Sequence, residues 1–423
     1  MTKNGYRDVI SAPSRSANAV LRALLVVILA VLPVKAVDSG KSSAARPLDG
    51  ERIVRVLQLS GSPYERGLQH GRELRPEIAR MVGLWKKDLQ EQSKMDPDAF
   101  LQKFFAETNF LPAIKRWTPD LLDEIKGIAE GSGQPYQTML AYQMVDEIWV
   151  YFDKPASHHC SGMGVIRSES HPAYIAQNMD LESYRDGSQV VLHIAEGPSA
   201  PEQFVFTAAG LIATNGMNNR SIAITANTLL DLSATPDGLP VACVVRGVLA
   251  RGKGEEVLSF IKTIKHASGQ NYIVGVGDRV YDFEASANKV VEFRPAPDGS
   301  VVYHTNHPLA NDDLKPWHEK QIKAMTLEEK NKGDSEVRLN SLATRLRKPT
   351  SAINEQVIKE TLQSKDSMDH PICRTVAAGG GWFSFGSTIM TLSDKPFFQV
   401  TMGPPDSNRF LRLEFSRIAG RKQ

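Results

Sequence analysis

Cys160 is one of three cysteines in the 423-residue chain, and its surroundings could do several kinds of chemistry. Two histidines, His158 and His159, precede it directly, and small residues follow it in the stretch PASHHCSGMGV. A zinc site is disfavoured, because the side chains of three consecutive residues diverge and no CxxC or HExxH spacing supports them. The alternatives left open are a disulfide to Cys243 or Cys373, a buried filler of the core, and a catalytic nucleophile.

The first residues of the chain differ in composition from the rest. The apolar run ALLVVILAVLPV spans residues 23–34, follows several arginines, and ends in small residues at Ala36. This pattern is typical of a secretory signal peptide, and the run is shorter than the ~20 residues that a membrane-spanning helix needs. We therefore predict that residues 1–36 are removed and that residues 37–52 form a disordered lead-in. We also expect a protein exported to the periplasm or secreted, with no stable membrane anchor.

The charge balance argues against a nucleic-acid partner. The whole chain has a formal net charge of +2, and residues 1–36 contain five lysines and arginines against Asp8 alone. Their removal takes away +4 and leaves about −2. Such a chain lacks the excess of basic residues that binds a phosphate backbone. In an exported protein with three cysteines, at least one thiol is also left unpaired.

The elements that must position Cys160 change in type at that residue. Before it, an alternating strand begins at Ile53, the chain breaks at residues 61–63, and helical patterns follow. One helix is predicted over residues 72–92, and another begins with Thr118 as its N-cap and Pro119 in its first turn, and ends at Gly131. The first helix carries an apolar stripe made of Leu74, Ile78, Met81 and Leu84.

Alternating segments predominate after Cys160 and predict strands. Two helical patches, residues 242–266 and 315–346, interrupt them. Runs of strands separated by runs of helix, without a regular alternation, indicate an α+β layered domain, with residues 53–159 as its helical N-terminal segment and residues 160–423 as its main part. The predicted strands lie within residues 173–181, 189–196, 203–210, 220–229, 272–286, 289–296, 301–307, 387–393 and 396–403.

Several short motifs occur in a characteristic order. They are GSPYERGLQHG, DEIKGIAEGSG, the cysteine, QNMD, GLIATNGMNNRSIAITANTL, LPVACVVRGVLA, YHTNHPL, DSEVRLNSL, HPICR, STIMTL and VTMGPP. In this order the chain resembles the N-terminal nucleophile (Ntn) hydrolases. Within them it resembles the branch of peptidase family C45 that includes acyl-coenzyme A:6-aminopenicillanate acyltransferase. The resemblance spans about residues 57–415 and implies a four-layer αββα sandwich without a metal or other cofactor.

The resemblance also implies a catalytic cysteine made by self-cleavage. Members of this superfamily cut themselves immediately before the nucleophile, which here is the His159–Cys160 bond. The products, residues 37–159 and 160–423, would stay associated as a heterodimer. A free α-amino group, with an ordinary pKa of roughly 7.7 to 8.0, would then serve Cys160 as its base. We accordingly interpret His158 and His159 as polar residues of a surface loop and not as a dyad with the cysteine.

Further site residues follow from the resemblance by position. Asp180, in QNMD, would orient the new ammonium group. Asn227 and Asn306 match the two places that supply side-chain donors to the tetrahedral oxyanion. Arg338 and Arg374 match arginines near the site and would pair with Asp180 or with a substrate carboxylate; a structural ion pair is the alternative for both.

The residues just before Asp180 complete the candidate set. Bile-salt hydrolases and acid ceramidases carry an arginine three residues before this aspartate, where the present chain has Gln177. This difference favours the penicillin-acyltransferase branch. Gln177 and the next residue, Asn178, are therefore candidates for contacting the substrate or supporting the site.

Three functions are compatible with these patterns. The favoured one is an exported, self-processed amide hydrolase or acyltransferase that acts on a small acylated amine, amino acid or peptide through an acyl group on Cys160. A serine hydrolase is a second hypothesis, because the chain contains GWFSFGS, although it lacks a G-x-S-x-G elbow. A non-enzymatic exported binding protein of the same fold is the third.

Overall fold

The computed structural model describes residues 52–153, 159–198, 200–296, 298–326, 332–375 and 381–416. The predicted signal peptide, the lead-in up to residue 51, and His158 lie outside these ranges, so the predictions about them stay predictions. Residues 48–423 form one compact unit. Among its described helices, none is both long and apolar enough to cross a membrane.

The described strands form two sheets, one of eight strands and one of six. Neighbouring strands are antiparallel except β1 and β4, which are parallel. The larger sheet has the order β1 (Val56–Leu59), β4 (Gln189–Ile194), β5 (Gln203–Ala208), β6 (Asn215–Asn218), β7 (Ile222–Thr228), β8 (Gln270–Val276), β9 (Arg279–Ala285), β10 (Val290–Glu292). The smaller has the order β11 (Val301–His304), β2 (Ser161–Val165), β3 (Ala173–Glu182), β12 (Trp382–Leu392), β13 (Phe397–Val400), β14 (Leu411–Glu414).

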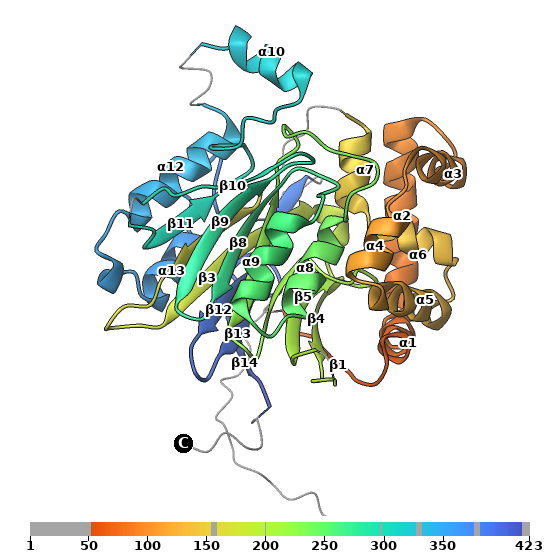
Figure 1. The fold of residues 1–423 in the computed structure, drawn as a ribbon, viewed down its shortest axis with the longest axis horizontal. Helices are drawn as coiled ribbons and strands as arrows, with labels where there is room; N and C mark the ends of the chain where they lie inside the picture. Colours follow the sequence, from red (N-terminus) through yellow and green to blue (C-terminus); the bar gives the residue numbers. More distant parts are fainter. Residues whose placement is uncertain are drawn as a thin grey trace, which may run out of the picture. The chain divides into compact units, whose positions relative to one another are not determined.

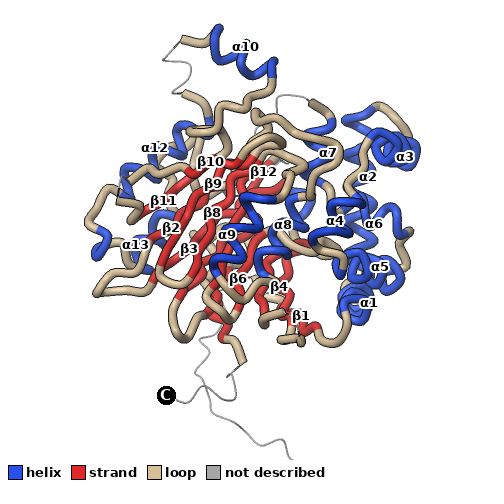
Figure 2. The backbone as a smooth tube through the Cα atoms, viewed as in Figure 1, coloured by secondary structure: helices blue, strands red, loops and turns tan. Residues whose placement is uncertain are grey.

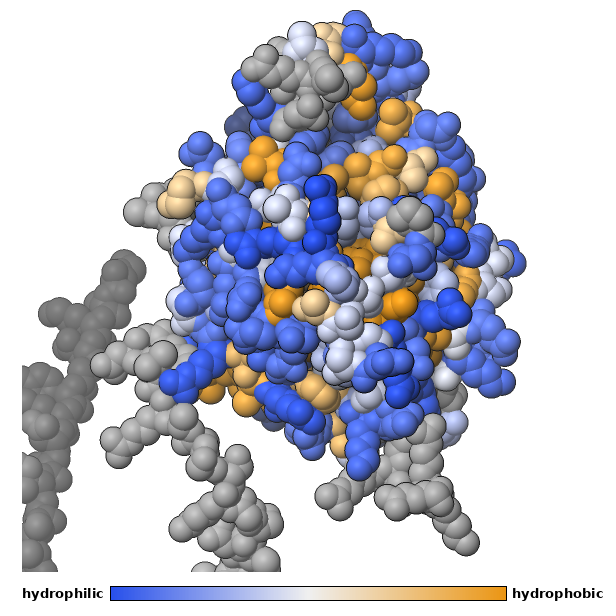
Figure 3. Space-filling model, turned by 90° about the vertical axis from the view of Figure 1, so that its left-hand side faces the viewer, coloured by the Kyte–Doolittle hydropathy of each residue, from blue (hydrophilic) through white to orange (hydrophobic). Residues whose placement is uncertain are grey.

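The sheets pack face to face between helical layers (Figure 2). Strands β2 and β3 contact β7, β8 and β9 across the interface. Helix α8 (Val241–Leu249), followed by α9 (Gly254–Thr263), covers the larger sheet, and α12 (Asp334–Leu346) and α13 (Glu355–Leu362) cover the smaller one (Figure 1). This αββα arrangement confirms the predicted fold. The side on which α12 and α13 lie is mainly hydrophilic, with scattered apolar patches (Figure 3).

The N-terminal segment is helical, as predicted, but contains more helices than the sequence patterns indicated. After Cys160, the described helices besides α8, α9, α12 and α13 are α10 (Pro316–Ala324) in the second helical patch and two short 3₁₀ helices, at Ser183–Arg185 and Thr350–Ala352. The helices of the N-terminal segment are α1 (Pro63–Glu73), α2 (Arg75–Ser93), α3 (Pro97–Glu107), α4 (Leu111–Trp117), α5 (Asp120–Ser132), α6 (Tyr136–Tyr142) and α7 (Val145–Tyr151).

Helix α1 corrects the prediction that helix begins near residue 72. Its N-terminus is closed by a capping box: Glu65 N–H donates to the Ser62 hydroxyl, and Ser62 N–H donates to the Glu65 carboxylate. The helix was missed because glycines replace apolar residues on its inner face. A Cβ on Gly67 would lie 1.9 Å from the Glu124 carbonyl oxygen of α5, so the glycines let α1 and α5 touch backbone to backbone.

Two details of the predicted helices were wrong. Pro119, and not Thr118, is the N-cap of α5. The helix ends at Ser132, one residue later than expected, and is capped by Gly133, whose φ of 74° is left-handed. On α2, Ile78 and Met81 are buried as predicted. The predicted next member, Leu84, is only partly buried, and Trp85 takes its place in the buried stripe.

Candidate active site

Cys160 immediately precedes β2, at the boundary that the sequence indicated. Its side chain is buried, and its sulfur lies 3.6 Å from Met179 Sδ and 3.9 Å from the backbone oxygen of Asp180. Burial raises the pKa of its thiol to about 12, so the thiol is neutral in the uncut chain. Cys160, Cys243 and Cys373 are all free, which excludes the disulfide alternatives.

Asp180 lies next to this cysteine, near the end of β3, and its charge contributes to the raised pKa of the Cys160 thiol. The side chain is fully buried. Its contact is an ion pair, with Arg374 Nε 3.3 Å from Oδ2. Burial raises the pKa of Asp180 to about 7 against the opposing effect of Arg374. The site therefore holds a fully buried acid whose ionised form is favoured by Arg374 and by the Ser384 hydroxyl and disfavoured by burial.

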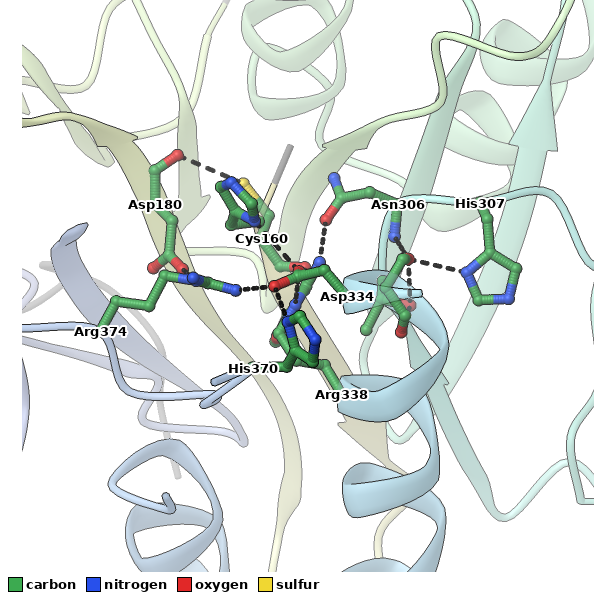
Figure 4. Close-up of polar contacts among 12 residues, drawn as sticks. Cys160, Asp180, Asn306, His307, Asp334, Arg338, His370 and Arg374 are labelled. Atoms are coloured by element: carbon green, nitrogen blue, oxygen red, sulfur yellow. Dashed lines mark hydrogen bonds and ion pairs between the residues drawn. The ribbon is translucent and has the colours of Figure 1, made fainter. Parts of the chain in front are cut away.

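Asp334, which the sequence analysis did not select, lies at the centre of the polar network (Figure 4). It is the first residue of α12. Its Oδ1 accepts from Arg338 Nε at 2.8 Å and lies 3.0 Å from His159 Nδ1, while its Oδ2 contacts Arg374 Nη2 and lies 3.0 Å from His370 Nδ1. Although burial opposes ionisation, these partners hold the pKa of Asp334 well below its usual range.

Arg338 links this network to the cysteine. Its guanidinium is fully buried, and Nη1 donates to the Cys160 carbonyl oxygen at 2.6 Å and to the Ser161 hydroxyl at 3.0 Å. Nη2 donates to Asn306 Oδ1 at 3.0 Å. The rigid fork of one arginine thus fixes Cys160, Asn306 and Asp334 relative to each other.

The two candidate oxyanion donors occupy different positions. Asn306 is joined to Cys160 through Arg338, and its Nδ2 donates to the Thr228 carbonyl at 3.1 Å. Asn227 lies between the sheets beside Gly162, where its Nδ2 donates to the His304 carbonyl at 3.1 Å. Each described hydrogen bond uses one of the two amide hydrogens, so a second hydrogen is left on both amides.

Gln177 and Asn178 point to opposite faces of β3. Gln177 Nε2 donates to Asn227 Oδ1 at 2.7 Å, which orients that amide and supports the site. Asn178 Nδ2 donates to the Leu362 and Ile372 carbonyls at 2.8 and 2.9 Å, so it ties β3 to the helical layer. The structure therefore brings Gln177 into the neighbourhood of the site but not the side chain of Asn178.

His159 is not the surface residue that we expected. It is 7% exposed, pairs with Asp334, and packs edge-on against Trp382 with ring centroids 5.3 Å apart. Burial lowers the pKa of its imidazole. No local pattern could predict the Asp334 contact, because the two residues are 175 positions apart in the chain. The residue on the upstream side of the expected cut is thus held firmly in the site.

The other chemistries have less support in the described residues. The GWFSFGS stretch lies within and next to β12, and both of its serines are buried strand residues with no strand-to-helix turn after them. Within the described ranges, no group of three or more His, Cys, Asp and Glu residues could hold a metal ion. What the site does contain is a thiol, an adjacent carboxylate and amide donors, which suits acyl transfer to sulfur.

A family model matches the part of the chain that follows β2. The model described as acyl-coenzyme A:6-aminopenicillanic acid acyl-transferase matches residues 166–401, which is more than half of the chain. The match includes Asp180, Asn227, Asn306, Arg338 and Arg374 but begins after the cysteine. It confirms the resemblance seen in the motifs. No curated protein matches the chain.

Several solved structures are distantly similar. The Caenorhabditis elegans ortholog of N-acylethanolamine-hydrolyzing acid amidase has 12% identity and a TM-score of 0.37, over 55% of this chain and 92% of that one. A variant of the Clostridium perfringens conjugated bile acid hydrolase has 12% identity and a TM-score of 0.40, over 61% and 98%. Penicillin V acylase from Agrobacterium tumefaciens has 14% identity and a TM-score of 0.36, over 61% and 87%. At these values the likenesses carry no argument about activity.

Proposed function

Because the chain belongs to the acyl-coenzyme A:6-aminopenicillanic acid acyl-transferase family, we propose that it is an exported cysteine Ntn enzyme. It cleaves itself before Cys160 and then breaks a linear amide, passing the acyl group to water or to another acceptor. The observation that carries the proposal is the buried pair of Cys160 and Asp180. The acid lies beside the residue whose new amino group it would bind, and it is fully buried with Arg374 as its ion-pair partner.

Self-cleavage is an acyl shift from nitrogen to sulfur. The Cys160 sulfur attacks the carbonyl carbon of His159, the peptide C–N bond breaks, and the thiol proton ends on the freed amine. Water then cleaves the resulting thioester, which leaves a carboxylate on His159 and a free thiol and amine on Cys160. Arg338 supports this step by holding the Cys160 carbonyl oxygen, and Asp334 supports it by holding the His159 ring.

The catalytic cycle repeats this chemistry on a substrate. The α-amine of Cys160 takes the thiol proton as the sulfur attacks the substrate carbonyl, and it gives that proton to the leaving amine when the C–N bond breaks. Water, or an acceptor amine, then attacks the thioester and releases the sulfur. Asn227 and Asn306 supply the amide hydrogens for the oxyanion, a contribution of about 2.7 to 4 kcal/mol per donor in measured enzymes.

The mass of the protein as purified tests the cleavage. We expect two associated chains, of 123 residues (37–159) and 264 residues (160–423). Cys160→Ala should give one uncut chain without activity. Cys243→Ala is the matched control, because Cys243 is also buried, with a thiol pKa raised to about 12, but lies on α8. A wild-type chain that stays intact for days, or a cleaved and active Cys160→Ala variant, contradicts the proposal.

A substrate panel separates an enzyme from a binding protein of the same fold. N-acylated amino acids, acyl-homoserine lactones, penicillins and acyl-coenzyme A donors would be incubated with the cleaved protein. The peptide that begins at Cys160 would then be examined for an added acyl mass. An adduct supports the acyl-enzyme. If cleaved protein binds members of the panel but never carries an adduct, the binding-protein hypothesis is favoured instead.

A further inference from the structure

Glu284 of β9 is a buried acid that the proposed mechanism does not use. Its side chain is 0% exposed, as is that of His304, whose Nε2 lies 2.8 Å from Glu284 Oε1. Three successive backbone N–H groups also donate to this carboxylate, those of Leu309 and Asn311 at 2.6 Å and that of Ala310 at 3.0 Å. One carboxylate therefore holds both the end of β11 and the loop that follows it.

Both proposed oxyanion donors meet this part of the chain. Asn306 lies two residues after His304, and Asn227 Nδ2 donates to the His304 carbonyl oxygen at 3.1 Å. Asn227 and Glu284 also lie in one row across the larger sheet, because each pairs with Asn271 of β8. Residues in such a row point to the same face of a sheet. Glu284 is thus two strands away from one donor and holds the segment that carries the other.

A matching row crosses the smaller sheet. His304 pairs with Gly162 of β2, and Gly162 pairs with Gln177 of β3. The two rows meet at one end through the contact of His304 with Glu284. At the other end Gln177 Nε2 donates to Asn227 Oδ1 at 2.7 Å. Because Gly162 stands two residues after the proposed nucleophile, the paired rows set the position of the donors relative to the sulfur.

The contact of Glu284 with His304 favours the charged form of both groups. Burial opposes both charges, but the hydrogen bond to His304 lowers the pKa of Glu284, and the carboxylates of Asp282 and Glu284 raise the pKa of His304. A buried ion pair adds little stability over apolar side chains, since both charges must leave water. Its directional bonds can nevertheless fix the position of a segment, which apolar contacts do less well.

We propose that Glu284 is a positioning residue for the oxyanion donors. It holds the segment 304–311 against the larger sheet, while Ser335 of α12 holds the same segment from the helical side by accepting the Asn306 N–H at 2.7 Å. The inference rests on the proposed function, because it assumes acyl transfer to Cys160. If the charge at Glu284 is lost, we expect the donors to move, and a shift of about 1 Å can cost roughly a hundredfold in rate.

Two reagents that react with the same sulfur isolate the oxyanion step. With 4-nitrophenyl acetate, the Cys160 sulfur attacks the carbonyl carbon, an electron pair moves onto the carbonyl oxygen, and the ester C–O bond then breaks to release 4-nitrophenolate. With iodoacetamide, the sulfur displaces iodide from a CH₂ carbon, and no oxyanion forms. In both reactions the α-amine takes the thiol proton. The ratio of the acylation rate to the alkylation rate therefore reports the oxyanion donors and cancels any general loss of reactive protein.

The ratio would be measured by mass on the peptide that begins at Cys160, using co-expressed chains that begin at residues 37 and 160. In Glu284→Gln it should fall at least tenfold, because the side chain keeps its size but loses its charge and gains a donor. His304→Gln breaks the same contact from the other side and should also lower the ratio, even if Glu284→Gln fails to fold.

Glu202→Gln is the matched control. Glu202 is likewise a buried acid that pairs with a histidine and a backbone N–H, since its Oε1 lies 2.5 Å from His193 Nε2 and its carboxylate accepts the Ser416 N–H at 3.0 Å. It joins β4 to the end of the described chain and not to the segment that carries Asn306. We therefore expect this variant to lose stability but to keep the wild-type ratio.

The outcomes separate this inference from the proposed function. An unchanged ratio in whichever of Glu284→Gln and His304→Gln folds, with Cys160 still acylated, overturns the positioning role and leaves the acyl-enzyme in place. An equal fall in Glu202→Gln overturns the role as well, because the effect would then follow the loss of any acid–histidine pair. If iodoacetamide alkylates Cys160 of the cleaved wild type but 4-nitrophenyl acetate never acylates it, both proposals are overturned.

Discussion

Replacing Asp334 by asparagine should weaken both the fold and the self-cleavage. The carboxylate bridges two arginines whose side chains are 0% and 14% exposed, so its charge is compensated deep in the protein. Asparagine keeps an oxygen for Arg338, but it puts an NH₂ group where Oδ2 now faces Arg374 and His370. The NH₂ group of the asparagine would then face the N–H groups of Arg374, and neither side offers an acceptor.

The magnitude follows from the burial of the partners. Removing one member of a buried ion pair typically costs 3 to 5 kcal/mol, and we take about 3 because Arg338 keeps its bonds to Cys160 and Asn306. For a compact unit spanning residues 48–423, ~2 cal/mol/K per residue gives an unfolding entropy of about 0.8 kcal/mol/K. The expected fall in Tm is therefore about 4 °C. Loss of the anchor on His159 should also slow cleavage at least tenfold.

The assay compares melting and cleavage rates of freshly purified precursor with a control on the same helix. Arg345 of α12 pairs with Asp366, but these side chains are 31% and 39% exposed, so Asp366→Asn should cost less than about 1 kcal/mol and leave cleavage unchanged. If Asp334→Asn matches this control in both measurements, the network is not the support that we derive from its geometry.

Four other outcomes are expected. Asp180→Asn, assayed as co-expressed chains that begin at residues 37 and 160, should lower kcat/KM at least about a hundredfold with little change in Tm, and near-wild-type activity contradicts its role. His159→Ala should slow cleavage as Asp334→Asn does, yet spare turnover by pre-cleaved chains. Gly67→Ala should destabilise by about 2 kcal/mol or more, because its Cβ meets α5, whereas Gly83→Ala, with nothing within 4 Å, should stabilise α2 by about 0.5 to 1 kcal/mol in denaturant titrations. Because the pKa of Asp334 is depressed by folding, its contribution should be full above the unfolded pKa of ~3.9 and fade below about pH 4, so the Tm gap between wild type and Asp334→Asn should narrow there.

The sequence predicted best what depends on neighbours along the chain. The strand patterns located most strands of both sheets, although strands such as β5 and β7 are buried along their whole length and therefore on both faces. Helical periodicity did not predict α1, because Gly67 and Gly71 occupy the face in contact with α5, where apolar residues usually lie. The capping-box spacing from Ser62 to Glu65 was the available signal. The boundary of the two chains at residue 160 stays a prediction.

The sequence could predict site contacts between residues close in the chain but not contacts between distant elements. Asp334 precedes Arg338 by four residues, a spacing at which an acid and a base meet on one helix face. Arg338 was predicted as a site residue, and this spacing could have identified Asp334 as well. The contact of Asp334 with His159 depends on how α12 lies across the end of β2, which no local pattern encodes.

The charges at the site explain why cleavage and catalysis would be coupled in this chain. Without the cut, burial raises the pKa of the Asp180 carboxyl to about 7 and that of the Cys160 thiol to about 12, so neither group is prepared for chemistry. Cleavage creates two opposite charges in the same place. The new ammonium can pair with Asp180 and lower its pKa, while the new carboxylate of His159 arises beside the arginines that hold Asp334. Both products of the cut would then meet a partner already in position, and the free amine becomes the base that the buried thiol lacks.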